Sequence, residues 1–139
     1  HHRLRSVQVT PGENVMDAAL ARIDAPDDVP PDILNLGPPT GIIEPQLGMR
    51  VQKMGRTSGL TEGTITQIDV AVNVDFEGQT ARFVDQIMTS KMSAPGDSGS
   101  AVLDEERRAA GLLFAGSDKV MLFTPIRRIL SHFDVTLVM

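Results

Sequence analysis

Residues 94–100 read Ala-Pro-Gly-Asp-Ser-Gly-Ser and place Ser98 between two glycines. Glycines allow the backbone to turn tightly, so that consecutive N–H groups can point at one spot. Such donors stabilise the oxyanion of a tetrahedral acyl-transfer intermediate, an effect worth about 10²–10³ in rate. The Ser98 hydroxyl is then a candidate nucleophile, provided that a base accepts its proton. Taken alone, the same residues also fit a polar hairpin loop rich in turn formers.

The sequence around this loop predicts β-strands. Residues 68–76 follow the period-two pattern of a half-buried strand, and their apolar positions are Ile68, Val70, Val72, Val74 and Phe76. Further strands are expected at 80–90, 100–103, 110–114 and 120–123. Strands about every ten residues, with turn signals between them, indicate an all-β sandwich or small barrel. Only residues 125–133 have helical spacing, with Pro125 in the first turn.

Upstream of the strands lies a stretch that is rich in proline. Residues 24–48 hold six of the nine prolines, and proline has no N–H to contribute to a β-ladder. Such a stretch suits a surface connector. We therefore divide the chain into a short front piece at 1–23, a linker at 24–48 and a main body at 49–139.

Composition excludes several classes of protein. The 139 residues carry a net charge of −5, and the sequence has no cysteine. Disulfides, thiolate nucleophiles and cysteine-based zinc sites are therefore excluded. The acidic balance and the lack of a Lys/Arg stripe argue against nucleic acid as a partner. No apolar run is long enough to span a membrane, and no motif implies a metal or an organic cofactor.

Three ordered segments resemble the chymotrypsin-like serine proteases, most closely the bacterial streptogrisins and α-lytic protease. Residues 17–22 are similar to the strand that bears the triad aspartate, and residues 51–65 to the opening hairpin of the second barrel. Residues 94–100 resemble the nucleophile loop. The resemblance covers about residues 14–139. It implies an all-β fold, a chymotrypsin-like antiparallel six-stranded barrel with a C-terminal helix, in which 1–23 is a remnant of the first barrel.

The resemblance also implies site residues. Ser98 matches the nucleophile, Asp17 matches the aspartate that orients the triad histidine, and the N–H groups of Gly96 and Ser98 match the oxyanion hole. Asp97 matches an aspartate that is buried against a positive charge. Arg56 is the candidate cation, although it also suits a solvated turn. Without Ser98 downstream, Asp17 would be an ordinary exposed aspartate before a strand.

The family's substrate-binding positions match a second set of residues. Phe114, Ala115 and Gly116 align with the edge strand that pairs with the substrate backbone. Met92 and Met121 fall near the primary specificity pocket, and core packing is the alternative role for both. With no acidic residue at its base, the pocket would leave a Lys or Arg side chain unpaired. We therefore expect a modest apolar side chain in this pocket.

The sequence departs from the family pattern in its histidines. The catalytic histidine of this fold precedes the aspartate by some tens of residues, but only sixteen residues precede Asp17. His1 and His2 are too near to serve, and they also fit a tag remnant. His132 lies on the expected helix, where a surface or capping role is expected. The position that follows Gly99 is Ser100 instead of glycine, and Phe114 occupies the place of a common serine.

Two functions remain open after this comparison. The first is a fragment of a serine endopeptidase that has lost its histidine-bearing part, by design or by proteolysis, and is itself inactive. The second is a non-catalytic, protease-like module that binds peptides. Joint retention of Ser98, Asp17 and the glycines favours the enzyme.

The expected partners follow from the same comparison. They are a peptide or protein substrate, the missing N-terminal barrel and, through the face which that barrel would cover, a second copy of the fragment. Neither nucleic acid nor a membrane is expected as a partner. The absence of cysteine slightly favours the cytoplasm, whereas the similar bacterial proteases are secreted, so the sequence does not decide the compartment.

Overall fold

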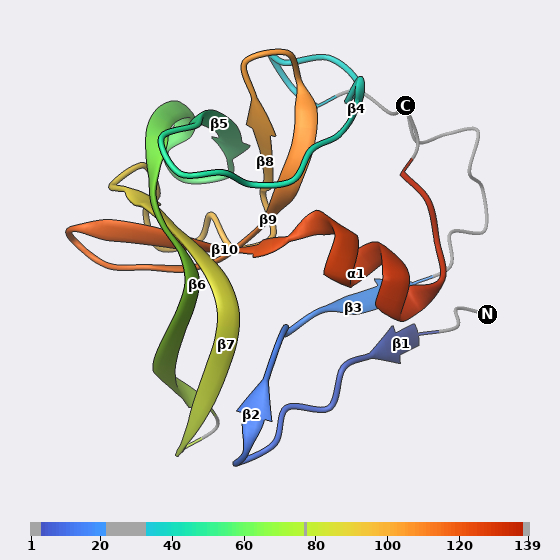
Figure 1. The fold of residues 1–139 in the computed structure, drawn as a ribbon, viewed down its shortest axis with the longest axis vertical. Coiled ribbons are helices and arrows are strands. Elements are labelled where there is room, and N and C mark those ends of the chain that lie inside the picture. Colours follow the sequence, from blue (N-terminus) through green and yellow to red (C-terminus); the bar gives the residue numbers. More distant parts are fainter. Residues whose placement is uncertain (1–3, 22–32, 77, 138–139) are drawn as a thin grey trace.

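The computed structural model describes residues 4–21, 33–76 and 78–137, and it is mostly β structure with one helix. Figure 1 shows its elements, which are β1 (Leu4–Ser6), β2 (Glu13–Asn14), β3 (Ala19–Ala21), β4 (Gly41–Ile42), β5 (Arg50–Gly55), β6 (Gly59–Phe76), β7 (Gln79–Ser90), β8 (Ala101–Asp104), β9 (Arg108–Gly116), β10 (Val120–Pro125) and α1 (Ile126–Phe133). Part of the predicted linker, residues 24–32, lies outside the described residues. The division into 1–23, 24–48 and 49–139 stays a prediction.

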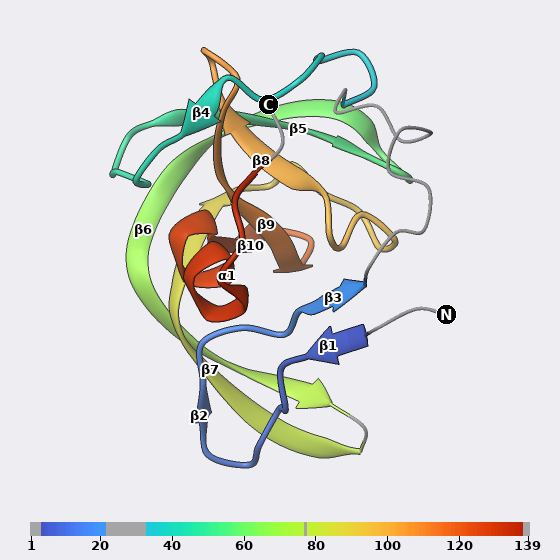
Figure 2. The same ribbon diagram turned by 90° about the vertical axis from the view of Figure 1, so that its right-hand side faces the viewer.

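Six strands close into a ring by antiparallel pairing. Their hydrogen-bonded order is β10–β7–β6–β5–β8–β9, and β9 pairs with β10 to complete the ring. The long hairpin of β6 and β7 curves along one side of the molecule (Figures 1 and 2). Outside the ring, β2 pairs in parallel with β7 and β4 pairs in parallel with β9. The ring confirms the predicted six-stranded antiparallel barrel.

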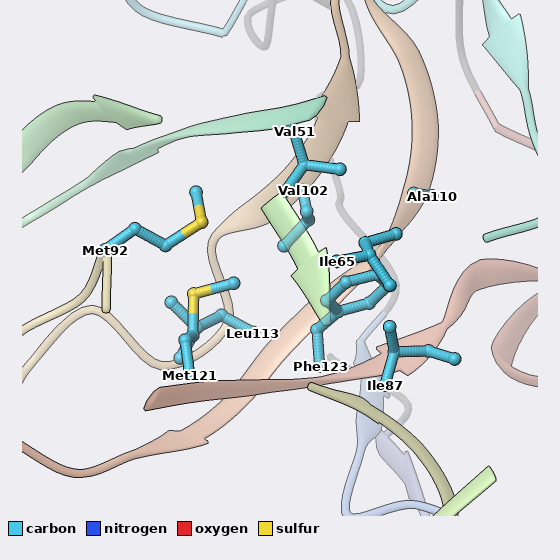
Figure 3. Packing of buried hydrophobic residues seen from close by; sticks show 9 residues of the cluster. All are labelled: Val51, Ile65, Ile87, Met92, Val102, Ala110, Leu113, Met121 and Phe123. Atoms are coloured by element: carbon cyan, nitrogen blue, oxygen red, sulfur yellow. The ribbon is translucent and has the colours of Figure 1, made fainter. Parts of the chain in front are cut away.

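The interior of the ring is filled mainly by aliphatic and methionine side chains, because the sequence has only five phenylalanines and neither tyrosine nor tryptophan. Nine buried side chains form this barrel core (Figure 3): Val51, Ile65, Ile87, Met92, Val102, Ala110, Leu113, Met121 and Phe123. Alternation along β5 places every second residue inside. Burial of one large apolar side chain contributes about 1.5–3 kcal/mol, so this cluster is the main source of barrel stability.

Strand β6 corrects one expectation from the alternating pattern. Ile68 was expected on the buried face, but 40% of its surface is exposed, whereas Val70 is buried. The pairing of β6 with β7 shifts register between Gln67 and Val70, and Asp69 between them has a φ of 55°. A bulge of this kind breaks the period-two alternation. Ile68 therefore turns outward although its neighbours follow the predicted pattern.

The N-terminal segment packs against the C-terminal helix (Figure 2). Met16 is buried with Ile129 and Phe133 of α1. Strands β1 and β3 form a separate two-stranded sheet, and the guanidinium of Arg5 donates to the carbonyl of Phe133 at 3.0 Å. The two ends of the described chain are thereby fastened together, with Asp17 just before β3.

Helix α1 confirms the helix predicted at 125–133, which begins one residue later than expected. Pro125 takes the N-cap position, and Asp134 ends the helix with a φ of 53°. The buried side chains, Ile126, Ile129 and Phe133, share one face at three- to four-residue spacing, whereas His132 is exposed. No helix in the described residues is long and apolar enough to cross a membrane.

Candidate active site

The loop that bears Ser98 connects β7 to β8 and depends on two glycines. Gly96 has a φ of 99° and Gly99 a φ of 89°, values that residues with a Cβ atom rarely adopt. A Cβ on Gly96 would also lie 2.3 Å from Oγ1 of Thr57. The N–H of Gly99 donates to the carbonyl of Leu113 at 2.8 Å, which joins the loop to β9. The glycine pattern that identified the loop is thus a geometric requirement.

Asp97 holds the loop in place through buried hydrogen bonds. Only 1% of its surface is exposed, and Oδ1 accepts the N–H groups of Thr57 and Ser58 at 2.8 and 3.1 Å. Oδ2 accepts the N–H of Ala94 at 2.8 Å and the hydroxyl of Ser58. Burial alone would raise the pKa of Asp97, but hydrogen bonds from the Ser58 hydroxyl and the three N–H groups hold it well below its usual range. Asp97 is therefore a charged, fully hydrogen-bonded carboxylate.

The cation next to Asp97 is Lys53, which corrects the expectation of Arg56. Lys53 and Asp97 have fully buried side chains, and Nζ lies 3.3 Å from Oδ2 of Asp97. Nζ also donates to the Ser58 hydroxyl and to the carbonyl of Gly59. Arg56 is exposed because it lies in the turn between β5 and β6, whereas Lys53 lies on the inward face of β5.

Gly55 leaves space for the Asp97 carboxylate of this ion pair. A Cβ at Gly55 would lie 2.3 Å from Oδ1 of Asp97, so the carboxylate occupies the space that any other residue would fill. Gly55 is on the same face of β5 as Lys53. The first hairpin of the barrel therefore supplies both the cation and the room that the nucleophile loop needs.

Ser98 itself is exposed, as a group that attacks an external substrate must be. Among the described residues, neither the N–H of Gly96 nor the N–H of Ser98 donates to a protein acceptor. The N–H of Asp97, which lies between them in the sequence, donates to the carbonyl of Ala94 at 3.1 Å. Two unengaged N–H groups on either side of an engaged one suit the binding of an oxyanion.

Ser98 and Asp17 line one common cavity. It has a volume of about 430 Å³ and lies between the nucleophile loop, the segment that leads into β3, strands β9 and β10, and helix α1. Its lining is Met16, Asp17, Ala18, Ala19, Ser98, Gly99, Leu112, Leu113, Phe114, Thr124 and Ile129. The structure thus brings together two residues that are far apart in the sequence. None of the lining residues is a histidine, and His132 borders a different hollow beside Arg128.

A second cavity, of about 530 Å³, opens on the other side of Ser98. Its lining is Lys91, Ser93, Ala94, Pro95, Ser98, Leu113, Phe114, Ala115, Gly116, Ser117 and Asp118. The three residues expected on the substrate edge strand, 114–116, are all present. Sequence reasoning missed Lys91, Ser93, Ser117 and Asp118, although their closeness in sequence to residues 94–98 and 114–116 was a usable signal.

Met92 and Met121 do not line this cavity, which corrects their assignment to the specificity pocket. They are 4% and 0% exposed, and both side chains belong to the barrel core (Figure 3). Alternation along the chain places Met92 inward and its neighbours Lys91 and Ser93 at the cavity. The core role that was the alternative for both methionines is the observed one.

Within residues 4–21, 33–76 and 78–137, no three His, Asp or Glu side chains are grouped so that they could hold a metal ion.

Comparison with solved structures gives the same fold. Chymotrypsin from Cellulomonas bogoriensis is 26% identical over 70% of this chain and 54% of its own length, with a TM-score of 0.62. Protease A from Thermobifida fusca is 28% identical over 75% of this chain and 57% of its own, with a TM-score of 0.64. An α-lytic protease homologue, at 21% identity over 73% of this chain and 53% of its own, shares the fold with a TM-score of 0.59.

The chain spans a little over half the length of these similar structures. No curated protein matches the sequence. The model of peptidase family S64 matches residues 14–139, which include Asp17, the whole barrel and the helix. The chain therefore belongs to peptidase family S64, a family of serine peptidases, and has the chymotrypsin-like fold.

Proposed function

We propose that this chain carries the nucleophile and the acidic member of a serine endopeptidase, and that a histidine from outside the chain completes the site. The observation that carries the proposal is the shared cavity of Asp17 and Ser98, about 430 Å³ in volume and lined by no histidine. Family membership supports the reaction class. Among the described residues no histidine lines the cavity beside Ser98, so we expect the chain alone to be inactive.

The residues in place suit the chemistry of acyl transfer. A histidine in the cavity accepts the proton of Ser98 as the hydroxyl attacks the peptide carbonyl, and Asp17 orients the ring and stabilises its charge. The N–H groups of Gly96 and Ser98 stabilise the oxyanion. The protonated histidine then gives its proton to the leaving amine, and water releases the acyl group from Ser98 by the same steps.

We propose that the second cavity takes a modest apolar side chain of the substrate. Most of its wall is apolar, from Ala94, Pro95 and Leu113 to Ala115, and its volume of about 530 Å³ is in the usual range for ligand pockets. The lining includes one acidic residue, Asp118, which is exposed, so it is not a buried partner for a basic side chain. Cleavage-site profiling should show apolar residues before the scissile bond, and a strict preference for Lys or Arg would contradict this assignment.

Peptide hydrolysis by a longer polypeptide that includes the histidine tests the function. Substitution Ser98→Ala should lower kcat by about 10⁵–10⁶, as the loss of a triad serine does in such enzymes. The matched control is Ser131→Ala, at an exposed serine on α1, which should leave kcat unchanged. Peptide binding without cleavage in a folded longer polypeptide would overturn the proposal in favour of a peptide-binding module.

We also propose that the face beside β1 and β3 is covered by a partner in the complete protein. In the described residues these strands form a sheet of only two, and an isolated pair of strands is marginal in water. In the chain alone a second copy would take this place. Light scattering should show a mass that rises with concentration, and a monomer at all concentrations would count against the proposal.

A further inference from the structure

The segment that carries Asp17 is tied to the barrel by buried polar side chains that the reaction itself does not use. Gln86 on β7 is 0% exposed, and Thr124 on β10 is 3% exposed. Buried strand positions are ordinarily apolar, and a buried amide costs stability unless each of its polar atoms is bonded. A buried glutamine here therefore needs a reason.

The bonds of Gln86 supply that reason. Its Nε2 donates to the carbonyl of Val15 at 2.8 Å and to that of Val84 at 3.0 Å. Its Oε1 accepts the hydroxyl of Thr124 at 2.7 Å. The side chain thus links β10, through β7, to a carbonyl two residues before Asp17.

A second buried amide also joins this segment to β7. Asn14 is 6% exposed, and its Nδ2 donates to the carbonyl of Arg82 on β7 at 3.0 Å. Its Oδ1 accepts the N–H of Thr10 at 2.8 Å, which closes the turn before β2. Residues 10–15 are therefore bound to β7 by two buried amides, in addition to the parallel pairing of β2 with β7. Further along the segment, Met16 packs against α1, and β3 pairs with β1.

Thr124 also lines the cavity that Asp17 and Ser98 share. One hydrogen-bonded chain, Thr124–Gln86–Val15, therefore runs from the wall of this cavity to the backbone that places Asp17 in it. Loss of one member of such a chain leaves a polar atom of the next member buried without a partner.

We propose that Gln86 and Thr124 are positioning residues that hold the Asp17 segment in register opposite Ser98. They act on Asp17 through the backbone at Val15. This inference rests on the proposed function, since Asp17 needs a fixed position only if it orients a histidine. The six-stranded barrel thereby positions both Ser98 and Asp17 with its own side chains.

Hydrogen exchange in the 139-residue chain tests the clamp without any activity. The reporter is strand β2, which pairs in parallel with β7, so that its amides are exposed when the segment leaves β7. Thr124→Val keeps the shape of the side chain but leaves Oε1 of Gln86 unpaired. Amide exchange in β2 should become about ten- to a hundredfold faster, and Gln86→Met should match it, while Thr124→Ser, which keeps the hydroxyl, should restore slow exchange.

A matched control separates this local effect from a general loss of stability. Val102→Ala removes buried apolar volume from the barrel core, far from the clamp in the sequence and on β8, and should lower global stability at least as much. Amide exchange in β2 should stay slow in this control under native conditions. Equal acceleration in Val102→Ala and Thr124→Val would overturn the clamp.

Kinetics of the longer polypeptide give the second readout. Thr124→Val should lower kcat by about tenfold or more at an unchanged KM, because a misplaced orienting group affects the transition state rather than substrate binding. Thr124→Ser should recover kcat. An unchanged kcat beside fast exchange would overturn the positioning role. If the longer polypeptide hydrolyses no peptide at all while exchange behaves as expected, the clamp stands and the proposed function fails.

Discussion

The two catalytic segments of this chain are supported in different ways. The nucleophile loop is held from inside the barrel, where Asp97 accepts four hydrogen bonds and pairs with the buried Lys53. Asp17 lies just before β3, on a segment that the pairing of β2 with β7, two buried amides and contacts with α1 hold in place. The contacts that hold the nucleophile loop all lie within the barrel. Asp17 depends on fewer contacts and on the partner that we propose to cover β1 and β3.

The largest effect should come from breaking the ion pair under the loop. Lys53→Met would leave Asp97 buried and charged without its cation, which typically costs about 3–5 kcal/mol. Urea denaturation of the 139-residue chain measures this as a fall in the free energy of unfolding. Arg56→Gln is the matched control, because Arg56 is exposed and should change stability by no more than about 0.5 kcal/mol. A reversed ranking of the two would contradict the assignment of Lys53.

A smaller loss should follow from filling the space beside Asp97. Gly55→Ala would place a Cβ 2.3 Å from Oδ1 of Asp97, and such overpacking costs about 1–3 kcal/mol. Gly41→Ala is the control, since its nearest contact would be an ordinary 3.8 Å from the Arg108 side chain. Thermal unfolding distinguishes the two variants, and an equal Tm for both would show that the seat of Asp97 is looser than the structure indicates.

Acid should lower the free energy of unfolding gradually, through protonation of Asp97. The pKa of Asp97 is lowered in the folded chain, so its stabilisation is fully present above the unfolded value of about 4 and is lost as the pH falls below it. One such group changes the free energy of unfolding by at most about 1.4 kcal/mol per pH unit. Denaturation between about pH 4 and 2 should show this slope, and Asp97→Asn should flatten it. An identical slope in the variant would mean that other carboxylates cause the loss.

The smallest effect is expected at the bulge in β6. Ile68→Thr should change stability by no more than about 0.5 kcal/mol, because Ile68 is 40% exposed. Val70→Thr, two residues on and buried, should cost more than Ile68→Thr because it buries a hydroxyl. Chemical denaturation of the pair measures the difference, and a larger loss at Ile68 would place the bulge elsewhere.

Local patterns predicted most of the barrel. Period-two alternation and turn signals identified the strands within one or two residues at 80–90, 100–103 and 120–123, because these strands obey rules that act over a few residues. The outward turn of Ile68 followed from a bulge at Asp69, which depends on the pairing partner. No property of residues 68–76 alone reveals that register.

The site was predictable to the extent that it lies in one loop. The glycines around Ser98 identified the loop, but the cation beneath Asp97 depended on which face of β5 points inward. A signal for Lys53 did exist, since it alternates with Val51 and Gly55 on the inward face, and an inward lysine requires an acidic partner. Gln86 and Thr124 left no comparable signal, because their bonds join residues that are 38 and 71 positions apart.

Reaction of Ser98 with a fluorophosphonate probe, measured by intact mass and peptide mapping, tests the central claim most directly. In a longer polypeptide that includes the histidine, we expect one adduct per chain on Ser98, lost in Ser98→Ala and slowed in Asp17→Asn. The 139-residue chain alone should react far more slowly, because no histidine is among the described residues that line the cavity of Ser98 and Asp17. A folded longer polypeptide that forms no adduct, or equal labelling of the short chain, would contradict the account.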